Sequence, residues 1–526
     1  MSNLVSPLNP PWLHARSSGL LLHLTSLPGD LGIGNLGTCA SEWLSFLKEC
    51  GQTSWQFCPV GPTSPGVGNS PYSSFSAFAG NPLLIDLSAL VENGLLNQDD
   101  LTPLRRLPQH WIDFDNLTPI HEQLLAKAFQ SFLSSQKSSV GSYGSFQDYQ
   151  KREAYWLDDY CLYQALKKRY DQSPWWEWPK TARDINKARK RKLTKEDLHY
   201  VQFHAFQQYL FDAQWNLLRE AAEESEIKLI GDAPIFVSHD SADTWAYPDI
   251  FALEKDGSVE LRAGVPPDYF AELGQLWGNP VYRWDVLKQR KYDWWLQRIR
   301  RDFSRYDWLR LDHFRAFHDY WAIPKEAEDA RTGTWEPGPG IDFFKALKKA
   351  SGVPSQLPII AEDLGDMGQE VFDLRDAVGL PGMKVLQFAF ASDPGNPHLP
   401  HNYYTANCVV YPGTHDNDTS AGWYANGSDR EKHNFRRYLS VDGNNASWDL
   451  IRAACASIAR LAIYAMQDIL SLGSEARFNT PGVASGNWNW RCTMEQLNQA
   501  RSESSAYLKE LTSRYGRHPE PSPYEG

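Results

Sequence analysis

Short apolar segments that end in polar or glycine-rich loops alternate with amphipathic segments along most of the chain. Eight of the apolar segments are strand candidates, bounded by turn residues. They are GLLLHLTSLPG (a strand at roughly 19–25), TSWQFCPVGP, KLIGDAPIFV, YDWLRLDHF, LPIIAEDLG, GMKVLQFAF, ANCVVYPGTHD and RLAIYAMQDIL. Helical patterns separate most of them, the first at 38–50. This alternation predicts the α/β class and a (β/α)8 barrel.

The spacing of the strand candidates is uneven. The second and third are separated by helical stretches at 117–136, 145–171 and 195–226, too much chain for one βα connection. We therefore expect one catalytic barrel over residues 1–526 with a mostly helical insertion at 87–225. A second insertion, at 238–283, is rich in Gly, Pro and aromatic residues.

The amino-acid composition of the chain limits the kinds of partner and cellular compartment that we expect. The chain has 52 Lys and Arg against 64 Asp and Glu, a formal net charge of −12, which disfavours binding to nucleic acid. There is no run of 18 apolar residues, and the first residues lack the pattern of a secretory signal. Seven dispersed cysteines without a CxxC pair indicate reduced thiols. We expect no membrane span and a cytoplasmic protein, with the plastid stroma as the alternative.

Carboxylates follow three of the predicted strands. Period 2 places Arg310 and Asp312 on the face opposite the two leucines of WLRLDH, pointing into the barrel near its mouth. Glu362 ends another strand, while its neighbour Asp363 is expected to cap the following helix. Asp416, beside a histidine, ends a third. A structural ion pair or a helix cap could explain each one alone, but convergence of three on one mouth favours a site.

Three inward carboxylates fit the cleavage of a glycosidic bond. One group must protonate the leaving oxygen and another must meet the positive charge that develops at C1. Metal binding is the competing use, but no HExxH, DxDxDG or Cys/His spacing supports it. The sequence also contains 21 Trp, 24 Tyr and 24 Phe, which either pack in cores or stack on sugar rings.

Longer motifs carry a family resemblance. RLDHF, IIAEDLG and GTHDNDT look like the conserved regions of the α-amylase clan. The chain from near 18 to about 491 resembles the amylomaltase (disproportionating enzyme) family, glycoside hydrolase family 77, in SLPGDLGIGNLG, SPYSSFSAFAGNP, GDAPIFVSHDSADTW, GVPPDYFAELGQLWGNPVY and RFNTPG. The resemblance implies a barrel without a separate C-terminal β-domain.

The resemblance also implies roles for individual residues. Asp312 would be the nucleophile, Glu362 the general acid/base, and Asp416 the carboxylate that stabilises the distorted sugar. The predicted substrate-binding residues are Tyr72, Asp232, Asp268, Tyr269, Phe270, Gln275, Trp277, Arg310, His415 and Asn479. Of these, Asp268 to Trp277 would form a lid. A cap role for Asp232 and core packing for the aromatics remain open from the sequence.

The implied reaction is 4-α-glucan transfer by a retaining mechanism. The partners would be α-1,4-glucans and maltooligosaccharides, with glucose as an acceptor. No cofactor or metal is expected, and the chain would be a monomer or homodimer. The alternatives are an α-1,4-glucan hydrolase using the same carboxylates, a glucan-binding protein without activity, and a phosphorylase. No phosphate loop or pyridoxal lysine pattern supports the last.

Overall fold

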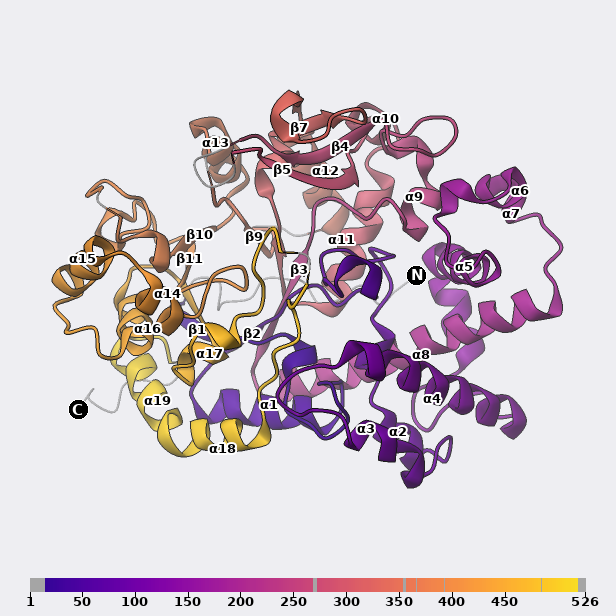
Figure 1. Ribbon diagram of the computed structural model, residues 1–526, viewed down its shortest axis with the longest axis horizontal. Helices are drawn as coiled ribbons and strands as arrows, with labels where there is room; N and C mark the ends of the chain where they lie inside the picture. Colours follow the sequence, from indigo (N-terminus) through magenta and orange to yellow (C-terminus); the bar gives the residue numbers. More distant parts are fainter. Residues whose placement is uncertain are drawn as a thin grey trace.

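A sheet of eight parallel strands lies at the centre of the computed structural model (Figure 1), which describes residues 15–267, 272–352, 356–365, 367–391, 393–483 and 485–518. A backbone hydrogen bond from Ala361 N–H to Pro381 O (2.9 Å) links the two end strands. The sheet is thus a nearly closed barrel, and the (β/α)8 prediction is confirmed. The strands in spatial order are β10 (Gly382–Val385), β11 (Cys408–Tyr411), β12 (Leu461–Ala465), β1 (Ser17–Leu21), β2 (Ser54–Gln56), β3 (Lys228–Ala233), β6 (Trp308–Leu311) and β9 (Ile359–Ala361).

Alternation along the strands separates the lumen from the outer core, as predicted. Leu309 and Leu311 belong to the large core that also contains the helices. A smaller, separate core fills the barrel interior. Its buried residues are Leu21, Ile230, Trp308, Ile360, Met383, Val409, Tyr411, Leu461 and Ile463. Because side chains two positions apart share a face, the residues that follow Ile230, Trp308 and Ile360 by two also point inward.

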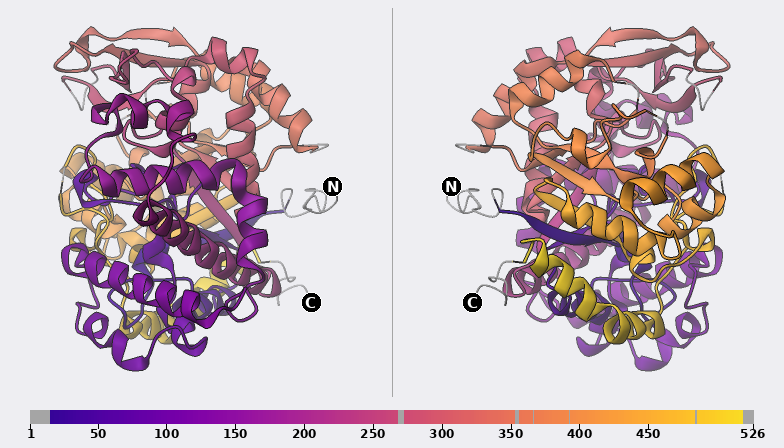
Figure 2. Two further views of the ribbon diagram at one scale, coloured as in Figure 1. Left: turned by 90° about the vertical axis from the view of Figure 1, so that its right-hand side faces the viewer. Right: turned by 90° about the vertical axis from the view of Figure 1, so that its left-hand side faces the viewer.

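Helices surround the barrel on all sides (Figures 1 and 2). Those between β1 and β3 are α1 (Thr38–Glu49), α2 (Leu87–Glu92), α3 (Thr102–Arg105), α4 (Phe114–Ser135), α5 (Phe146–Arg169), α6 (Lys180–Arg183), α7 (Ile185–Ala188) and α8 (Lys195–Glu224). The later ones are α9 (Ala242–Ala246), α10 (Trp284–Gln289), α11 (Asp293–Arg305), α12 (Gly340–Ser351), α13 (Gln369–Val378), α14 (Ser420–Asn426), α15 (Asp429–Leu439), α16 (Ala446–Ala456), α17 (Met466–Ile469), α18 (Met494–Glu503) and α19 (Ser505–Arg514). Within the described residues, no strand follows β12.

The long connection between β2 and β3 is helical, and α4, α5 and α8 lie where helices were predicted. These helices occupy the right and lower parts of Figure 1. The last of them, α8, leads directly into β3, and its Trp215 donates a hydrogen bond from Nε1 to the carbonyl of Arg305, at the end of α11 (3.2 Å). The division of the chain at 87–225 and 238–283 stays a prediction.

A second, antiparallel sheet lies at the top of Figure 1 and was not predicted from the sequence. Its order is β5 (Gln275–Pro280), β4 (Leu261–Val265), β7 (Asp319–Pro324) and β8 (Thr334–Pro337). The first two strands come from the connection after β3, and the other two follow β6. The predicted lid region is therefore joined by backbone hydrogen bonds to the chain that follows Asp312.

Asp363 lies at the seam where β9 meets β10. Its Oδ1 accepts a hydrogen bond from Met383 N–H in β10 (2.7 Å), and its Oδ2 pairs with Arg375 of α13. The prediction that Asp363 caps the following helix is wrong, because Gly368 occupies the N-cap position of α13. The buried carboxylate instead satisfies a backbone donor of the neighbouring strand and so helps to close the barrel.

None of the helices in the described part of the chain has both the length and the apolar character needed to cross a membrane.

Candidate active site

The carboxyl ends of β3, β6 and β9 bring charged side chains together at one mouth of the barrel. Asp232, Arg310 and Glu362 each follow a lumen residue by two positions, so all three continue the inward face. Asp312 continues the face of Arg310 just beyond β6. The inward pair predicted at Arg310 and Asp312 is therefore found in contact.

Arg310 connects two carboxylates through one nitrogen. Its Nη1 donates hydrogen bonds to Asp232 Oδ2 (2.7 Å) and to Asp312 Oδ1 (2.9 Å). The Asp232 side chain is 1% exposed, whereas that of Asp312 is 28% exposed. Burial acts to lower the pKa of Arg310, but the two carboxylates outweigh it and raise that pKa. Asp312 is thus the member of the trio that both faces the opening and accepts a hydrogen bond from a fixed positive charge.

Glu362 has a different environment. Its Oε2 accepts a hydrogen bond from His313 N–H (2.7 Å), and its Oε1 accepts one from Leu364 N–H (2.9 Å). The residue is 8% exposed. Burial raises its pKa to about 7; Arg310 opposes that shift and the charge of Asp312 adds to it. A substantial fraction of Glu362 therefore keeps its proton near neutral pH.

Asp416 is held by its neighbours from the loops after β11 and β12. His415 Nε2 lies 3.3 Å from Asp416 Oδ2, and Asn479 donates a hydrogen bond from Nδ2 to Oδ1 (2.6 Å). Desolvation acts against the charged form, but His415 and Asn479 together lower the pKa of Asp416. In return, Asp416 raises the pKa of the buried His415 against the effect of burial. The pair thus favours a positive charge on His415 next to a carboxylate whose side chain is 44% exposed.

Tyr72 links these two groups of residues. Its hydroxyl donates a hydrogen bond to Asp232 Oδ2 (2.8 Å), and its ring stacks on His415 with centroids 5.1 Å apart and an interplanar angle of 18°. Asp232 is buried beneath Tyr72 and Arg310. Burial, together with the charge of Asp312, raises the pKa of Asp232 to about 6 despite Arg310. The contacts of Asp232 are with residues of the site itself; its predicted contact with sugar stays a prediction.

The second sheet brings part of the predicted lid to the same mouth. Trp277 of β5 is 38% exposed, and its ring meets His313 edge-on at 4.9 Å. Its Nε1 donates a hydrogen bond to Gln275 Oε1 (3.0 Å). Three other predicted lid residues, Asp268, Tyr269 and Phe270, lie outside the described residues.

The sequence analysis did not identify two residues that complete the arrangement. Trp488 lies 5.7 Å from Tyr72 and 5.9 Å from His415 by ring centroids, with a left-handed φ of +64°. Arg477 donates a hydrogen bond from Nη2 to the Asp416 carbonyl (2.6 Å). The available signal was an aromatic residue in the polar, glycine-containing loop GNWNW, close to RFNTPG. Within the described residues, no cluster of three or more His, Cys, Asp or Glu could hold a metal ion.

The arrangement contrasts a carboxyl with a raised pKa, Glu362, with an ion-paired carboxylate, Asp312. Such a difference between neighbouring acids suits acid/base and nucleophilic roles in one reaction. It arises from placement alone: Glu362 is enclosed and bonded to backbone N–H groups, whereas Asp312 accepts a hydrogen bond from a guanidinium.

Comparisons with known proteins point to one family. A sequence model of the family described as 4-alpha-glucanotransferase matches residues 22–497. The chain is 45% identical to the 4-alpha-glucanotransferase of Thermus thermophilus over 506 residues, covering 95% of this chain and 99% of that protein. Identity to the Synechocystis 4-alpha-glucanotransferase is 44%, with coverage of 96% and 99%. The solved amylomaltase from Streptococcus agalactiae in complex with acarbose is similar at a TM-score of 0.89 and 37% identity, covering 96% of this chain and all of that one.

Proposed function

The chain belongs to the 4-alpha-glucanotransferase family, and on that premise we propose that it transfers α-1,4-glucan segments with retention, through a glycosyl ester on Asp312. Membership of the family supports the 4-alpha-glucanotransferase activity itself. We propose in addition the covalent intermediate, the acceptor and the roles of individual residues.

In the first half-reaction, Asp312 attacks C1 of the donor sugar while the bond from C1 to the leaving oxygen breaks. Glu362 gives its proton to that oxygen, and the shortened glucan leaves. In the second half-reaction, the 4-OH of glucose or a maltooligosaccharide attacks C1, gives its proton to Glu362 and releases Asp312. Both residues return to their starting states.

The observation that supports this proposal best is that Glu362 and Asp312 lie in opposite electrostatic environments. Burial raises the pKa of Glu362 to about 7, as a general acid acting near neutral pH requires. Asp312 accepts a charge-assisted hydrogen bond from Arg310 at 2.9 Å, which fixes the orientation of the carboxylate that would attack C1.

The remaining residues would hold the donor sugar. Asp416 and His415 present a carboxylate and an imidazole ring to sugar hydroxyls, and the Tyr72 ring offers an apolar face beside them. The S. agalactiae amylomaltase was solved with acarbose, and we expect the same compound to bind this chain at the barrel mouth.

On the acceptor side, Trp277 supplies an exposed indole next to the residue that follows Asp312. A sugar stacked on it would occupy the position from which water could otherwise reach the ester. We propose glucose, maltooligosaccharides and longer glucans as acceptors. The oligomeric state, monomer or homodimer, and the location, cytoplasm or plastid stroma, stay predictions.

Incubation of the purified protein with maltotriose tests the proposal. We expect glucose and a ladder of longer maltooligosaccharides to appear while the number of reducing ends stays constant. An Asp312→Asn protein prepared in parallel controls for contaminating amylases. A steady rise in reducing ends, with only glucose and maltose formed, would instead identify a hydrolase. If no product forms from maltotriose or longer glucans, the protein is not a transferase under these conditions and the proposal fails.

A further inference from the structure

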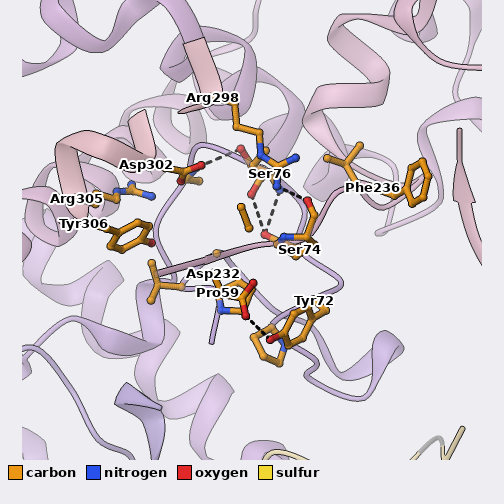
Figure 3. A pocket seen from close by; sticks show the side chains of 18 residues that line it. Pro59, Tyr72, Ser74, Ser76, Asp232, Phe236, Arg298, Asp302, Arg305 and Tyr306 are labelled. Carbon is orange, nitrogen blue, oxygen red and sulfur yellow. Dashed lines mark hydrogen bonds between the residues drawn. The ribbon is translucent and has the colours of Figure 1, made fainter. Parts of the chain in front are cut away.

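A cavity of about 50 Å³ lies behind the site, between the loops that follow β2 and β3 on one side and α11 on the other. Figure 3 shows its labelled side chains, with Asp232 and Tyr72 at one end and Arg298, Asp302 and Arg305 of α11 at the other. Asp232 belongs to both the site and the cavity, whereas the α11 residues take no part in the site described above.

Four polar atoms of the lining residues are buried without a hydrogen-bond partner among the described residues. They are Asp232 Oδ1, Asp302 Oδ2, Arg298 Nε and Arg305 Nε. The four residues are between 3% and 6% exposed. A buried donor or acceptor without a partner costs about 1–3 kcal/mol, so such atoms are normally bonded to protein or to ordered water.

The cavity has the properties of a hydrated one. A single water needs roughly 10–15 Å³ of this kind of volume and two to four polar partners. The volume of about 50 Å³ exceeds that requirement, and the unpartnered set contains two acceptors and two donors. Water in the cavity can therefore supply partners for these atoms, among them Asp232 Oδ1 and Asp302 Oδ2.

We propose that ordered water in this cavity joins Asp302 to Asp232, and that Asp302 is thereby a positioning residue for the Arg310–Asp312 pair. The inference rests on the role proposed above for Asp312. Asp302 acts at a distance: through water on Asp232, through Asp232 on Arg310 Nη1, and through that shared nitrogen on the nucleophile.

Charged groups from several elements face Asp302. Arg298, Arg301 and Arg305 belong to its own helix, Asp232 to β3, and Asp212 of α8 pairs with Arg301 and Arg305. Burial raises the pKa of Asp302 to about 6, the three arginines oppose this, and Asp232 adds to it. Removing the charge of Asp302 should therefore lower the pKa of Asp232.

Asp302→Asn tests this coupling because it removes the charge and keeps the shape. We expect kcat for maltotriose disproportionation to fall about five- to tenfold with little change in KM. The acid limb of the rate profile should move to lower pH, because Asp232 then loses its proton at lower pH. A variant that only loosened α11 would lose activity without moving that limb.

Asp307→Asn is the matched control. Asp307 follows α11, accepts a hydrogen bond from Leu229 N–H (2.9 Å) and lies 3.7 Å from Lys228, outside the cavity. We expect this variant to lose some thermal stability while the pH profile stays in place. An equal shift in both variants would overturn the proposal.

A crystal structure of the wild-type protein gives a second readout that does not depend on a variant folding. Density for water within hydrogen-bonding distance of both Asp232 Oδ1 and Asp302 supports the proposal, and a dry cavity overturns it. Failure of wild-type protein to disproportionate maltotriose would refute the proposed function. A wild type that disproportionates, with an Asp302→Asn profile unchanged, would refute this inference alone.

Discussion

Arg310 donates hydrogen bonds from the same nitrogen, Nη1, to Asp232 at 2.7 Å and to Asp312 at 2.9 Å. Asp232 is buried, and Asp312 faces the opening of the barrel. Because the two N–H groups of one nitrogen make both bonds, a change in the charge or position of either carboxylate alters the bond to the other. The electrostatic surroundings of Asp312 are therefore set partly by a buried carboxylate on a neighbouring strand.

Asp312→Asn should leave the fold intact and reduce transfer from maltotriose by about 10³-fold or more, because the amide is not a nucleophile. The measurement is the initial rate of glucose release, together with a thermal melt to confirm folding. Freshly purified protein is required, since deamidation would restore the carboxylate. Substantial activity in such a preparation would exclude Asp312 as the nucleophile.

Glu362 should give kcat/KM an alkaline limb near pH 7. Its pKa is raised to about 7, so the proton that the leaving oxygen needs is lost as the pH rises through that value. Rates measured from pH 4 to 9 at constant ionic strength check this. A rate that stays constant to pH 9 would show that Glu362 is not the acid.

Glu362→Gln separates the acid role from the stability effect. The variant should lose transfer from maltotriose but still release fluoride from α-maltosyl fluoride, whose leaving group needs no proton. Between the unfolded pKa of about 4.3 and the folded value, the native wild type binds a proton that the unfolded chain lacks. Wild-type stability therefore falls as pH rises through this window, and the variant should gain up to about 3 kcal/mol relative to it. Urea titrations at pH 4 and 8 measure the gain, and an equal difference at both pH values would contradict the assignment.

Trp277→Ala should weaken acceptor use more than donor cleavage. Loss of one stacking face corresponds to roughly a three- to tenfold rise in the KM for glucose as acceptor, with a larger share of hydrolysis. Trp335→Ala is the control, because Trp335 is 39% exposed on β8 of the same sheet but stacks against Arg315. Equal loss of cleavage and transfer in Trp277→Ala would place that residue outside the acceptor site.

Asp363→Ala should lower the free energy of unfolding by about 3–5 kcal/mol. The change removes the buried partner of Arg375 and leaves Met383 N–H without its acceptor. Asp376→Ala removes a partner of the same arginine that is 49% exposed, and should cost less than about 1 kcal/mol. Urea denaturation of both proteins distinguishes the two effects; similar losses would mean that the seam does not depend on Asp363.

The local sequence pattern was sufficient to predict the barrel and to predict which strand side chains point into it. Period 2 in WLRLDH separates Leu309 and Leu311 from Arg310 and Asp312, and the structure has the same division. The strand ends also identified Glu362 and Asp416, since barrel strands converge at one mouth.

The pattern failed where long-range pairing decides the structure. Strands β7 and β8 form because they pair with β4 and with each other, and nothing within their own segments indicated this. The structural role of Asp363 depends on the backbone N–H of Met383, twenty positions away. Local sequence does not show this contact, so it favoured a helix cap. Trp488 reaches Tyr72 and His415 through a left-handed backbone turn that its residue type disfavours.

The seam between β9 and β10 separates Asp312 and Glu362 from Asp416 in the strand order. Asp312 and Glu362 follow β6 and β9, at one end of the strand order, whereas Asp416 follows β11, next to the other end. The strand ladder joins these two halves through β3, β2, β1 and β12, and the hydrogen bond from Ala361 N–H to Pro381 O joins them across the seam. The bonds across this seam, from Ala361 N–H to Pro381 O and from Met383 N–H to Asp363 Oδ1, therefore help to set the spacing between the two groups of carboxylates.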